Sequence, residues 1–141
     1  MKIKEASGKE VKKINLWKSR EWTRFDKDVG YSWEQKKHVL VAYDNKEIVG
    51  FLEFKITGGA SYLSELLILK EKRRSGIGTG LLKEFEKISR RERCHVAYLE
   101  TSTSHKSAIP FYKKNGYKVI AKLKNNKYHL DWCFLEKRLK R

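Results

Sequence analysis

Residues 65–82 read E-L-L-I-L-K-E-K-R-R-S-G-I-G-T-G-L-L. The stretch passes from an apolar, strand-like run at Glu65–Leu69 through a basic connector to the glycine-rich turn Gly76–Gly80, after which apolar residues recur at helical spacing. The first N–H groups of a helix have no internal acceptor, and the helix dipole adds partial positive charge there. Glycine lets an anion approach that backbone closely. The stretch therefore predicts a phosphate site where a strand gives way to a helix.

The spacing of the glycines separates the kinds of phosphate loop. A P-loop needs G-x-x-x-x-G-K-[ST], and Leu81 stands where its second glycine should be, so this loop is excluded. The dinucleotide fingerprint G-x-G-x-x-G matches at Gly76 and Gly78 but again meets Leu81, although Glu100 could serve as its ribose-binding acid. Hairpin-like segments also precede the loop, whereas that fingerprint belongs to the first βα unit of a parallel sheet. A helix start whose glycines only permit close packing stays open as an alternative.

Composition and charge limit the classes of partner. The chain has 141 residues, with 33 Lys and Arg against 17 Asp and Glu, which gives a formal charge of +16. One domain over residues 1–141 is expected at this length. The charge favours anionic partners, either a phosphate-bearing cofactor, an acidic protein segment or RNA. A Lys/Glu-rich solvated surface of the kind found in hyperthermophiles is the competing explanation.

Targeting and metal-binding patterns are lacking in the sequence. No apolar run has the length of a membrane span, and Met1–Glu5 lacks the apolar region of a secretory signal, so a cytoplasmic protein is expected. Cys94 and Cys133 form no C-x-x-C pair, so neither a metal site nor a disulfide framework is expected. Both cysteines are expected to be buried apolar thiols.

Hydrophobic periodicity predicts a mixture of strands and helices. A meander of three antiparallel strands precedes the glycine loop, and a helix, a strand, a second helix and a closing hairpin follow it. A capping box, Ser7 with Glu10, starts a helix near the N-terminus, and Ser32 could start a further short helix. The predicted strands are 3–6, 38–43, 47–56, 62–69, 96–100, 117–123 and 128–139, and the predicted helices are 7–20, 78–91 and 105–115.

Two sequence blocks resemble the GNAT acetyltransferases, which bind acetyl-coenzyme A. Arg73-x-x-Gly76-x-Gly78 resembles the R/Q-x-x-G-x-G/A pyrophosphate loop of that family. Residues 99–117 resemble its strand, N-x-x-A-I-x-x-Y helix and G-[FY] turn, except that His105 stands where the family has Asn. Two blocks in the right order and at the right separation are far more specific than either alone, and they lie within residues 65–117, a little over a third of the chain.

The resemblance implies a fold and a cofactor site. The expected fold is α/β (α+β), a mostly antiparallel central sheet of six to seven strands flanked by about four helices, with a splayed parallel strand pair. The backbone of one strand edge would pair with the pantetheine arm of the cofactor, and the glycine loop would hold its pyrophosphate. The implied cofactor-binding residues are Leu67, Ile68, Leu69, Arg73, Arg74, Ser75, Gly76, Ile77, Gly78, Thr79, Gly80, His105 and Tyr112, with no metal.

The resemblance also implies a catalytic set. Tyr112 matches the family's tyrosine near the sulfur, which can protonate the leaving thiolate, although a core aromatic is the plainer interpretation. Glu100 and Glu65, at the two splayed strands, are the candidates for the base, with Glu53 as an outside candidate. A backbone N–H near Leu67 would stabilise the oxyanion.

The implied function is an N-acetyltransferase that moves an acetyl group from acetyl-CoA to a primary amine, either a protein N-terminus or a lysine, and the acceptor could be an acidic peptide or protein. The alternative is an RNA- or ribosome-binding module that keeps the fold. A polyamine acceptor is the weaker third option, because a cationic surface repels polycations. The substrate walls are expected from residues 22–37 and 117–139, including Tyr128, His129 and Trp132. Monomer and homodimer both remain open.

Overall fold

The computed structural model describes residues 1–140, which divide into two compact units, Met1–Glu34 and a second unit that begins at Gln35. The single domain expected over residues 1–141 stays a prediction, and each unit is described by itself. In chain order the elements are α1 Gly8–Val29, β1 Lys36–Asp44, β2 Glu47–Thr57, β3 Ala60–Ile68, η1 Lys70–Lys72, α2 Ile77–Arg91, β4 Val96–Ser102, α3 Ala108–Lys114, β5 Lys118–Leu123, η2 Lys127–His129 and β6 Trp132–Arg138.

The first unit is one long helix. The predicted capping box is present, since the Glu10 N–H donates to Ser7 Oγ at 3.3 Å and the Ser7 N–H donates to Glu10 Oε1 at 3.0 Å. The predicted end near Arg20 is wrong, because no glycine or proline interrupts the chain until Gly30, which closes the helix with a φ of 76°. The strand predicted at 3–6 and the short helix predicted from Ser32 are also wrong. A strand needs a partner, and Ile3 is 83% exposed.

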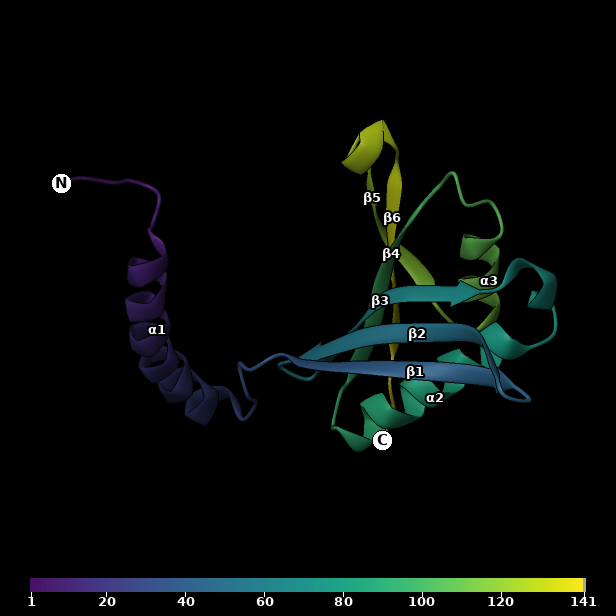
Figure 1. Cartoon of the computed structure of the whole chain (residues 1–141), viewed down its shortest axis with the longest axis horizontal. Helices are drawn as coiled ribbons and strands as arrows, with labels where there is room; N and C mark the ends of the chain where they lie inside the picture. The colour runs from purple at the N-terminus through teal and green to yellow at the C-terminus, as the bar shows by residue number, and fades with distance from the viewer. Residues whose placement is uncertain (141) are drawn as a thin grey trace. The chain divides into compact units, whose positions relative to one another are not determined.

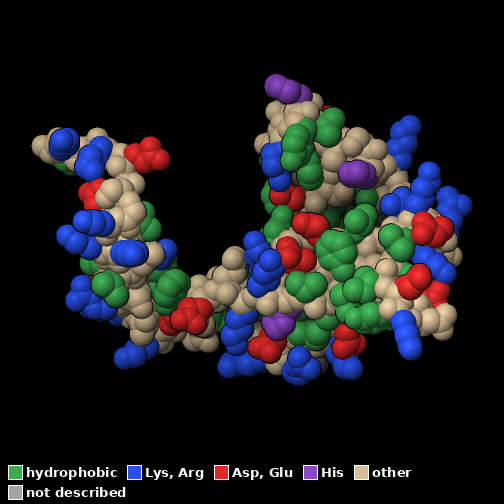
Figure 2. All heavy atoms as spheres, viewed as in Figure 1, with side chains coloured by type: hydrophobic (Ala, Val, Ile, Leu, Met, Phe, Trp, Pro, Cys, Tyr) green, Lys and Arg blue, Asp and Glu red, His purple; other side chains and the backbone are tan. Residues whose placement is uncertain are grey.

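The second unit is a six-stranded sheet in the order β1-β2-β3-β4-β6-β5 (Figure 1). The β3–β4 pair is parallel, and every other neighbouring pair is antiparallel. The predicted mixed fold is confirmed, with three α-helices among residues 1–140 in place of about four. Lys and Arg side chains are spread over the face in Figure 2 and form no single stripe.

The core lies between the sheet and α2. The predicted apolar face of that helix is confirmed, since Leu81, Leu82, Phe85 and Ile88 are buried in one cluster with strand residues such as Leu52, Phe54, Leu99 and Leu135. Both cysteines are free and buried, as predicted.

A bulge in β3 decides which side chains face the core. Glu53 pairs with Glu65 while Phe54 pairs with Leu63, so Ser64 is an extra residue on β3. Because one inserted residue shifts the alternation of a strand, Leu66 and Ile68 pack against the core cluster. Glu65 and Leu67 therefore lie on the opposite face.

An ion pair between a buried glutamate and a partly buried lysine joins α2 to β6. Glu86 is 4% exposed, and its Oε1 accepts from Lys137 Nζ at 2.6 Å. Lys137 Nζ also donates to the Asn115 carbonyl at 3.0 Å. The pair therefore ties the core helix to β6 and to the turn after α3.

We expect Lys137→Met to lower the free energy of unfolding by about 3 kcal/mol, because it leaves the Glu86 carboxylate buried without its nearest ammonium. The double variant Glu86→Leu with Lys137→Met should recover most of that loss, since it removes both charges. Urea unfolding followed by circular dichroism measures both. A double variant no more stable than the single one would contradict this account.

Candidate active site

β3 and β4 start as a parallel pair and then separate. Their register joins Ala60 to Val96, Ser61 to Ala97 and Tyr62 to Tyr98, and no further pair follows within residues 1–140. Beyond this point β3 stays paired with β2 as far as Ile68, and β4 stays paired with β6 as far as Ser102. The strand edges that face each other there are free to bind an extended ligand through backbone groups. The predicted splayed parallel pair is confirmed.

The glycine loop leads from β3 into the start of α2. Gly76 caps the helix with a φ of 86°, a left-handed conformation that favours glycine, and its carbonyl accepts the Gly80 N–H at 3.0 Å. The three amides between them, those of Ile77, Gly78 and Thr79, have no acceptor one turn back. The first turn contains no acidic residue, and no side chain caps it. The helix start is therefore open to an anion.

Gly78 brings the two sequence blocks into contact. A Cβ placed at Gly78 would lie 3.4 Å from Cζ of Phe111, so α3 packs against the first turn of α2. Tyr112, the next residue on α3, belongs to the same core cluster as Leu81 and Leu82. The tyrosine and the glycine loop thus lie on the same side of the sheet.

Tyr112 is 7% exposed, with ring centroids 5.1 Å from Phe111 and 5.7 Å from Tyr117. Its hydroxyl makes no hydrogen bond with the residues that the structure describes. Burial raises the pKa of Tyr112 to about 12, so the hydroxyl stays protonated near neutral pH.

The residues between β3 and α2 are partly engaged with one another. Arg73 Nε donates to the Ile68 carbonyl at 3.1 Å, and the Leu69 N–H donates to the Val49 carbonyl at 2.9 Å. The Ser75 hydroxyl donates to the Lys72 carbonyl. Arg74 has a φ of 63°, and Leu67 is 53% exposed. The Arg73 contact uses only Nε, so the two terminal NH2 groups of Arg73 remain for a phosphate.

Glu100 lies on β4 just beyond the last paired residue. Its Oε1 accepts from Lys127 Nζ at 2.6 Å and from the Tyr62 hydroxyl at 3.2 Å. Burial, followed by the nearby Glu100 carboxylate, raises the pKa of Tyr62 to about 12. Glu65 is exposed on β3, opposite Glu53, which binds Lys37 at 2.9 Å. The two proposed bases therefore come from the two strands that splay.

His105 is not helical, which corrects the helix predicted for 105–115. The helix begins at Ala108, while the His105 N–H donates to the Ser102 carbonyl at 3.2 Å in the preceding turn. Pro110 explains the late start, because proline has no N–H and is tolerated only in the first turn of a helix. His105 therefore lies between the end of β4 and α3.

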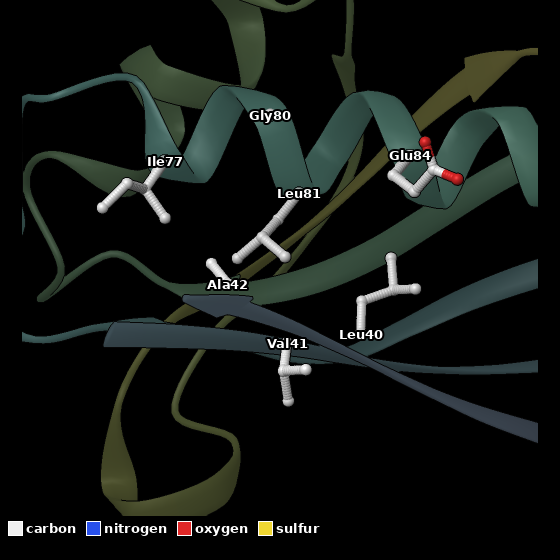
Figure 3. Close-up of a pocket in the computed structure, with 7 residues that line it drawn as sticks. All are labelled: Leu40, Val41, Ala42, Ile77, Gly80, Leu81 and Glu84. Atoms are coloured by element: carbon white, nitrogen blue, oxygen red, sulfur yellow. The ribbon is translucent and has the colours of Figure 1, made fainter. Parts of the chain in front are cut away.

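A hollow of about 330 Å³ lies between β1 and α2 (Figure 3). Ile77 and Leu81 point from α2 toward β1 in this view, while Val41 points away. The lining residues come only from these two elements and are Leu40, Val41, Ala42, Ile77, Gly80, Leu81 and Glu84.

Comparison with known proteins agrees with this geometry. The family model described as the acetyltransferase (GNAT) family matches residues 10–117. The chain belongs to the GNAT family. Among curated GNAT relatives, an N-alpha-acetyltransferase of Sulfurisphaera tokodaii is 32% identical over 111 residues, which cover 70% of this chain and 65% of that protein. The chain spans about half to two thirds of the length of the curated relatives it matches.

Two solved structures show the GNAT fold. An acetyltransferase of Bacillus cereus superposes with a TM-score of 0.77 at 21% identity, covering 99% of this chain and 98% of that one. An N-acetyltransferase of Thermoplasma acidophilum in complex with coenzyme A gives a TM-score of 0.64 at 27% identity, covering 72% and 60%.

Sequence reasoning missed two side chains that contact the candidate base Glu100, those of Tyr62 and Lys127. The alternation of β3 and β4 could have placed Tyr62 on the face of Glu100, because both point away from the core. No local pattern indicates Lys127, which reaches Glu100 from the turn between β5 and β6. Among residues 1–140 no cluster of metal ligands occurs, and no helix is long and apolar enough to cross a membrane.

Proposed function

We propose that this GNAT chain is an acetyl-CoA-dependent N-acetyltransferase that transfers the acetyl group directly to a primary amine in a ternary complex. The observation that carries the proposal is the separation of β3 from β4 beside the glycine-lined start of α2. This arrangement offers an extended ligand free strand edges and offers its diphosphate an uncapped helix start. A cytoplasmic location stays a prediction from sequence.

Cofactor binding is assigned to the chain from Leu67 to Gly80. The amides of Ile77, Gly78 and Thr79 would donate to the diphosphate, and Arg73 and Arg74 would add positive charge. The backbone of β3 near Leu67 and Ile68 would pair with the pantetheine arm, and His105 would meet it from the turn before α3. These assignments extend the predicted cofactor site and rest on the free edge of β3.

The catalytic groups have distinct tasks. The bound cofactor supplies a thioester, whose carbonyl carbon is open to attack by an amine. Glu100 would take a proton from the incoming ammonium, with Glu65 as the second candidate. A backbone N–H near Leu67 would stabilise the oxyanion, and the Tyr112 hydroxyl would donate a proton to the departing sulfur. The raised pKa of Tyr112, about 12, suits a donor that must stay protonated.

A matched pair of peptides tests both activity and acceptor class. One peptide has a free N-terminus and no lysine, and the other has the same sequence with an acetylated N-terminus and one internal lysine. We expect heat of binding with acetyl-CoA alone in calorimetry, and release of free thiol when one of these amines is added. No heat at high micromolar acetyl-CoA would refute the proposal, and thiol release at the same rate without peptide would show hydrolysis instead.

The formal charge of +16 supports RNA binding as a second candidate function. Binding through phosphates would weaken steeply as salt increases. A filter-binding titration with single-stranded RNA at two salt concentrations measures this dependence. Absent or salt-independent binding would refute RNA binding. On the face shown in Figure 2 the Lys and Arg side chains are scattered and mark no single RNA-binding surface.

A further inference from the structure

The half-exposed side chain of Lys127 places its ammonium against Glu100 and Trp132, and Tyr62 binds the same Glu100; we call these three side chains the cage. Lys127 Nζ is 2.6 Å from Glu100 Oε1 and 4.5 Å from the centroid of the Trp132 ring. Glu100 also accepts from the Tyr62 hydroxyl at 3.2 Å. A carboxylate and an indole face are both attractive to an ammonium group. The carboxylate and the indole therefore suit a primary ammonium, and a lysine of the chain itself contacts both.

The turn that carries Lys127 is held in place by its own hydrogen bonds. The Lys127 carbonyl accepts from Trp132 Nε1 at 3.0 Å, and the Asn126 N–H donates to the Leu130 carbonyl at 2.8 Å. Asp131 Oδ1 accepts the Asn125 N–H at 2.8 Å. The side chain of Lys127 is thus presented from an ordered turn.

The same turn contains backbone strain. Tyr128 and His129 have φ values of 60° and 58°, in a region that residues other than glycine rarely adopt. Tyr128 is also 82% exposed, so burial of its ring does not offset the strain. Strained residues of this kind persist where the surrounding structure over-determines them, often beside functional sites. The strain indicates that this turn conformation is maintained because it positions Lys127.

We infer that the Lys127 ammonium stands in the place of the acceptor amine and that Lys127 is an acetylation site of the chain itself. The inference rests on the proposed function and adds to it both a location for the acceptor and a modified residue. Glu100 lies two residues beyond Tyr98, the last residue of β4 that pairs with β3, so the cage adjoins the gap whose edge on β3 is assigned to the pantetheine arm.

The transfer to Lys127 balances with acetyl-CoA as the only co-reactant. Glu100 accepts one proton from the ammonium, and the nitrogen lone pair forms a bond to the acetyl carbon. The carbon–sulfur bond breaks, Tyr112 donates its proton to the sulfur, and the nitrogen loses its second proton to restore Tyr112. The products are acetyl-lysine, coenzyme A and one proton that Glu100 releases to water.

Two other lysines provide internal controls. Lys72 also lies 2.6 Å from a carboxylate oxygen, that of Asp44, but it belongs to the connector between β3 and α2. Lys124 belongs to the same turn as Lys127 and makes no ion pair with the described residues. Lys72 tests whether an ion pair with a carboxylate is by itself enough for acetylation. Lys124 tests whether a position in this turn is by itself enough for acetylation.

The experiment incubates the full chain with acetyl-CoA and follows each lysine by peptide mass spectrometry. We expect Lys127 to be acetylated at least about tenfold faster than Lys72 and Lys124, because proximity to the base and the thioester favours it. Lys127→Arg should keep the charge and bind acetyl-CoA with unchanged heat while acquiring no label at this position. Glu100→Gln should slow labelling of Lys127 without changing the slow labelling of Lys72.

Competition locates the acceptor. A peptide that the enzyme acetylates should suppress labelling of Lys127 when the peptide is present at a saturating concentration, because the peptide amine and the Lys127 amine would compete for the same cage. The inference would be overturned by equal labelling of the three lysines. It would also be overturned if the enzyme acetylated a peptide while Lys127 stayed unlabelled, or if the peptide did not reduce the labelling of Lys127. Each of these results would leave the proposed function standing. Absence of any heat with acetyl-CoA would instead overturn the proposed function, and this inference with it.

Discussion

Replacing Tyr112 by phenylalanine is expected to lower kcat by about 100-fold, the scale of general acid catalysis. The substitution removes only the hydroxyl, which makes no hydrogen bond with the residues that the structure describes. The ring keeps its contacts with Phe111 and Tyr117. KM for acetyl-CoA and the free energy of unfolding should therefore change little. Steady-state kinetics with the better of the two peptides, together with urea unfolding, measure the three quantities.

Tyr117→Phe is the matched control for that variant. Tyr117 is also buried, but its hydroxyl donates to Glu86 Oε2 at 3.4 Å in the ion-pair cluster of α2 and β6. Its loss should cost about 1 kcal/mol of stability and leave kcat within about twofold. If the two variants lowered kcat equally, the effect would reflect packing of the aromatic pair and would argue against proton donation by Tyr112.

The pH profile gives Tyr112 a second test. Burial raises the pKa of its hydroxyl to about 12 from an ordinary value of about 10. The proton is therefore present throughout the neutral range and is lost only as the pH rises through the raised value. We expect no fall in kcat from loss of this proton up to about pH 9. A fall that Tyr112→Phe abolishes would show that the hydroxyl ionises earlier.

Local sequence patterns predicted the parts of the fold that local interactions determine. The apolar face of α2 follows from the spacing of Leu81, Leu82, Phe85 and Ile88, and its start follows from the glycines before it. The early end predicted for the first helix is wrong because Asp26 and Asp28 are only mildly unfavourable within a helix, and the helix continues past both. The break required the glycine at position 30.

The features of the structure that could not be predicted from the sequence depend on the pairing register between strands that are distant in the chain. The bulge at Ser64 turns Glu65 and Leu67 away from the core, and only the pairing with β2 reveals it. The contact of Lys127 with Glu100 likewise depends on where the turn after β5 lies against β4. The resemblance to GNAT enzymes named Glu100 as a base without indicating that a lysine already binds it. Tertiary contacts of this kind have no local signature.

Thr79→Asp is expected to weaken acetyl-CoA binding by about 30-fold or more. Thr79 lies in the first turn of α2, which contains no acidic residue. Two like unit charges about 5 Å apart repel by roughly 3 kcal/mol at an effective dielectric constant of about 20, so a carboxylate in this turn would oppose a diphosphate bound there. The same carboxylate should stabilise the protein by about 0.3–1 kcal/mol, because it complements the helix dipole. The affinity for acetyl-CoA, measured by calorimetry, should therefore fall, while the free energy of unfolding, measured with urea, should rise.

Thr57→Asp is the control for that variant, because it makes the same chemical change at an exposed residue at the end of β2. Thr57 pairs with Ala60, whereas the residue of β2 that pairs with the end of β3 is Gly50, so the control lies at the far end of the strand from the glycine loop. Its Kd for acetyl-CoA should stay within about twofold of the parent chain, since salt screens charges at such a distance. Equal losses in both variants would mean that net charge attracts the cofactor. An unchanged Kd in Thr79→Asp would mean that the diphosphate binds away from α2, and the assignment of its first turn would then be wrong.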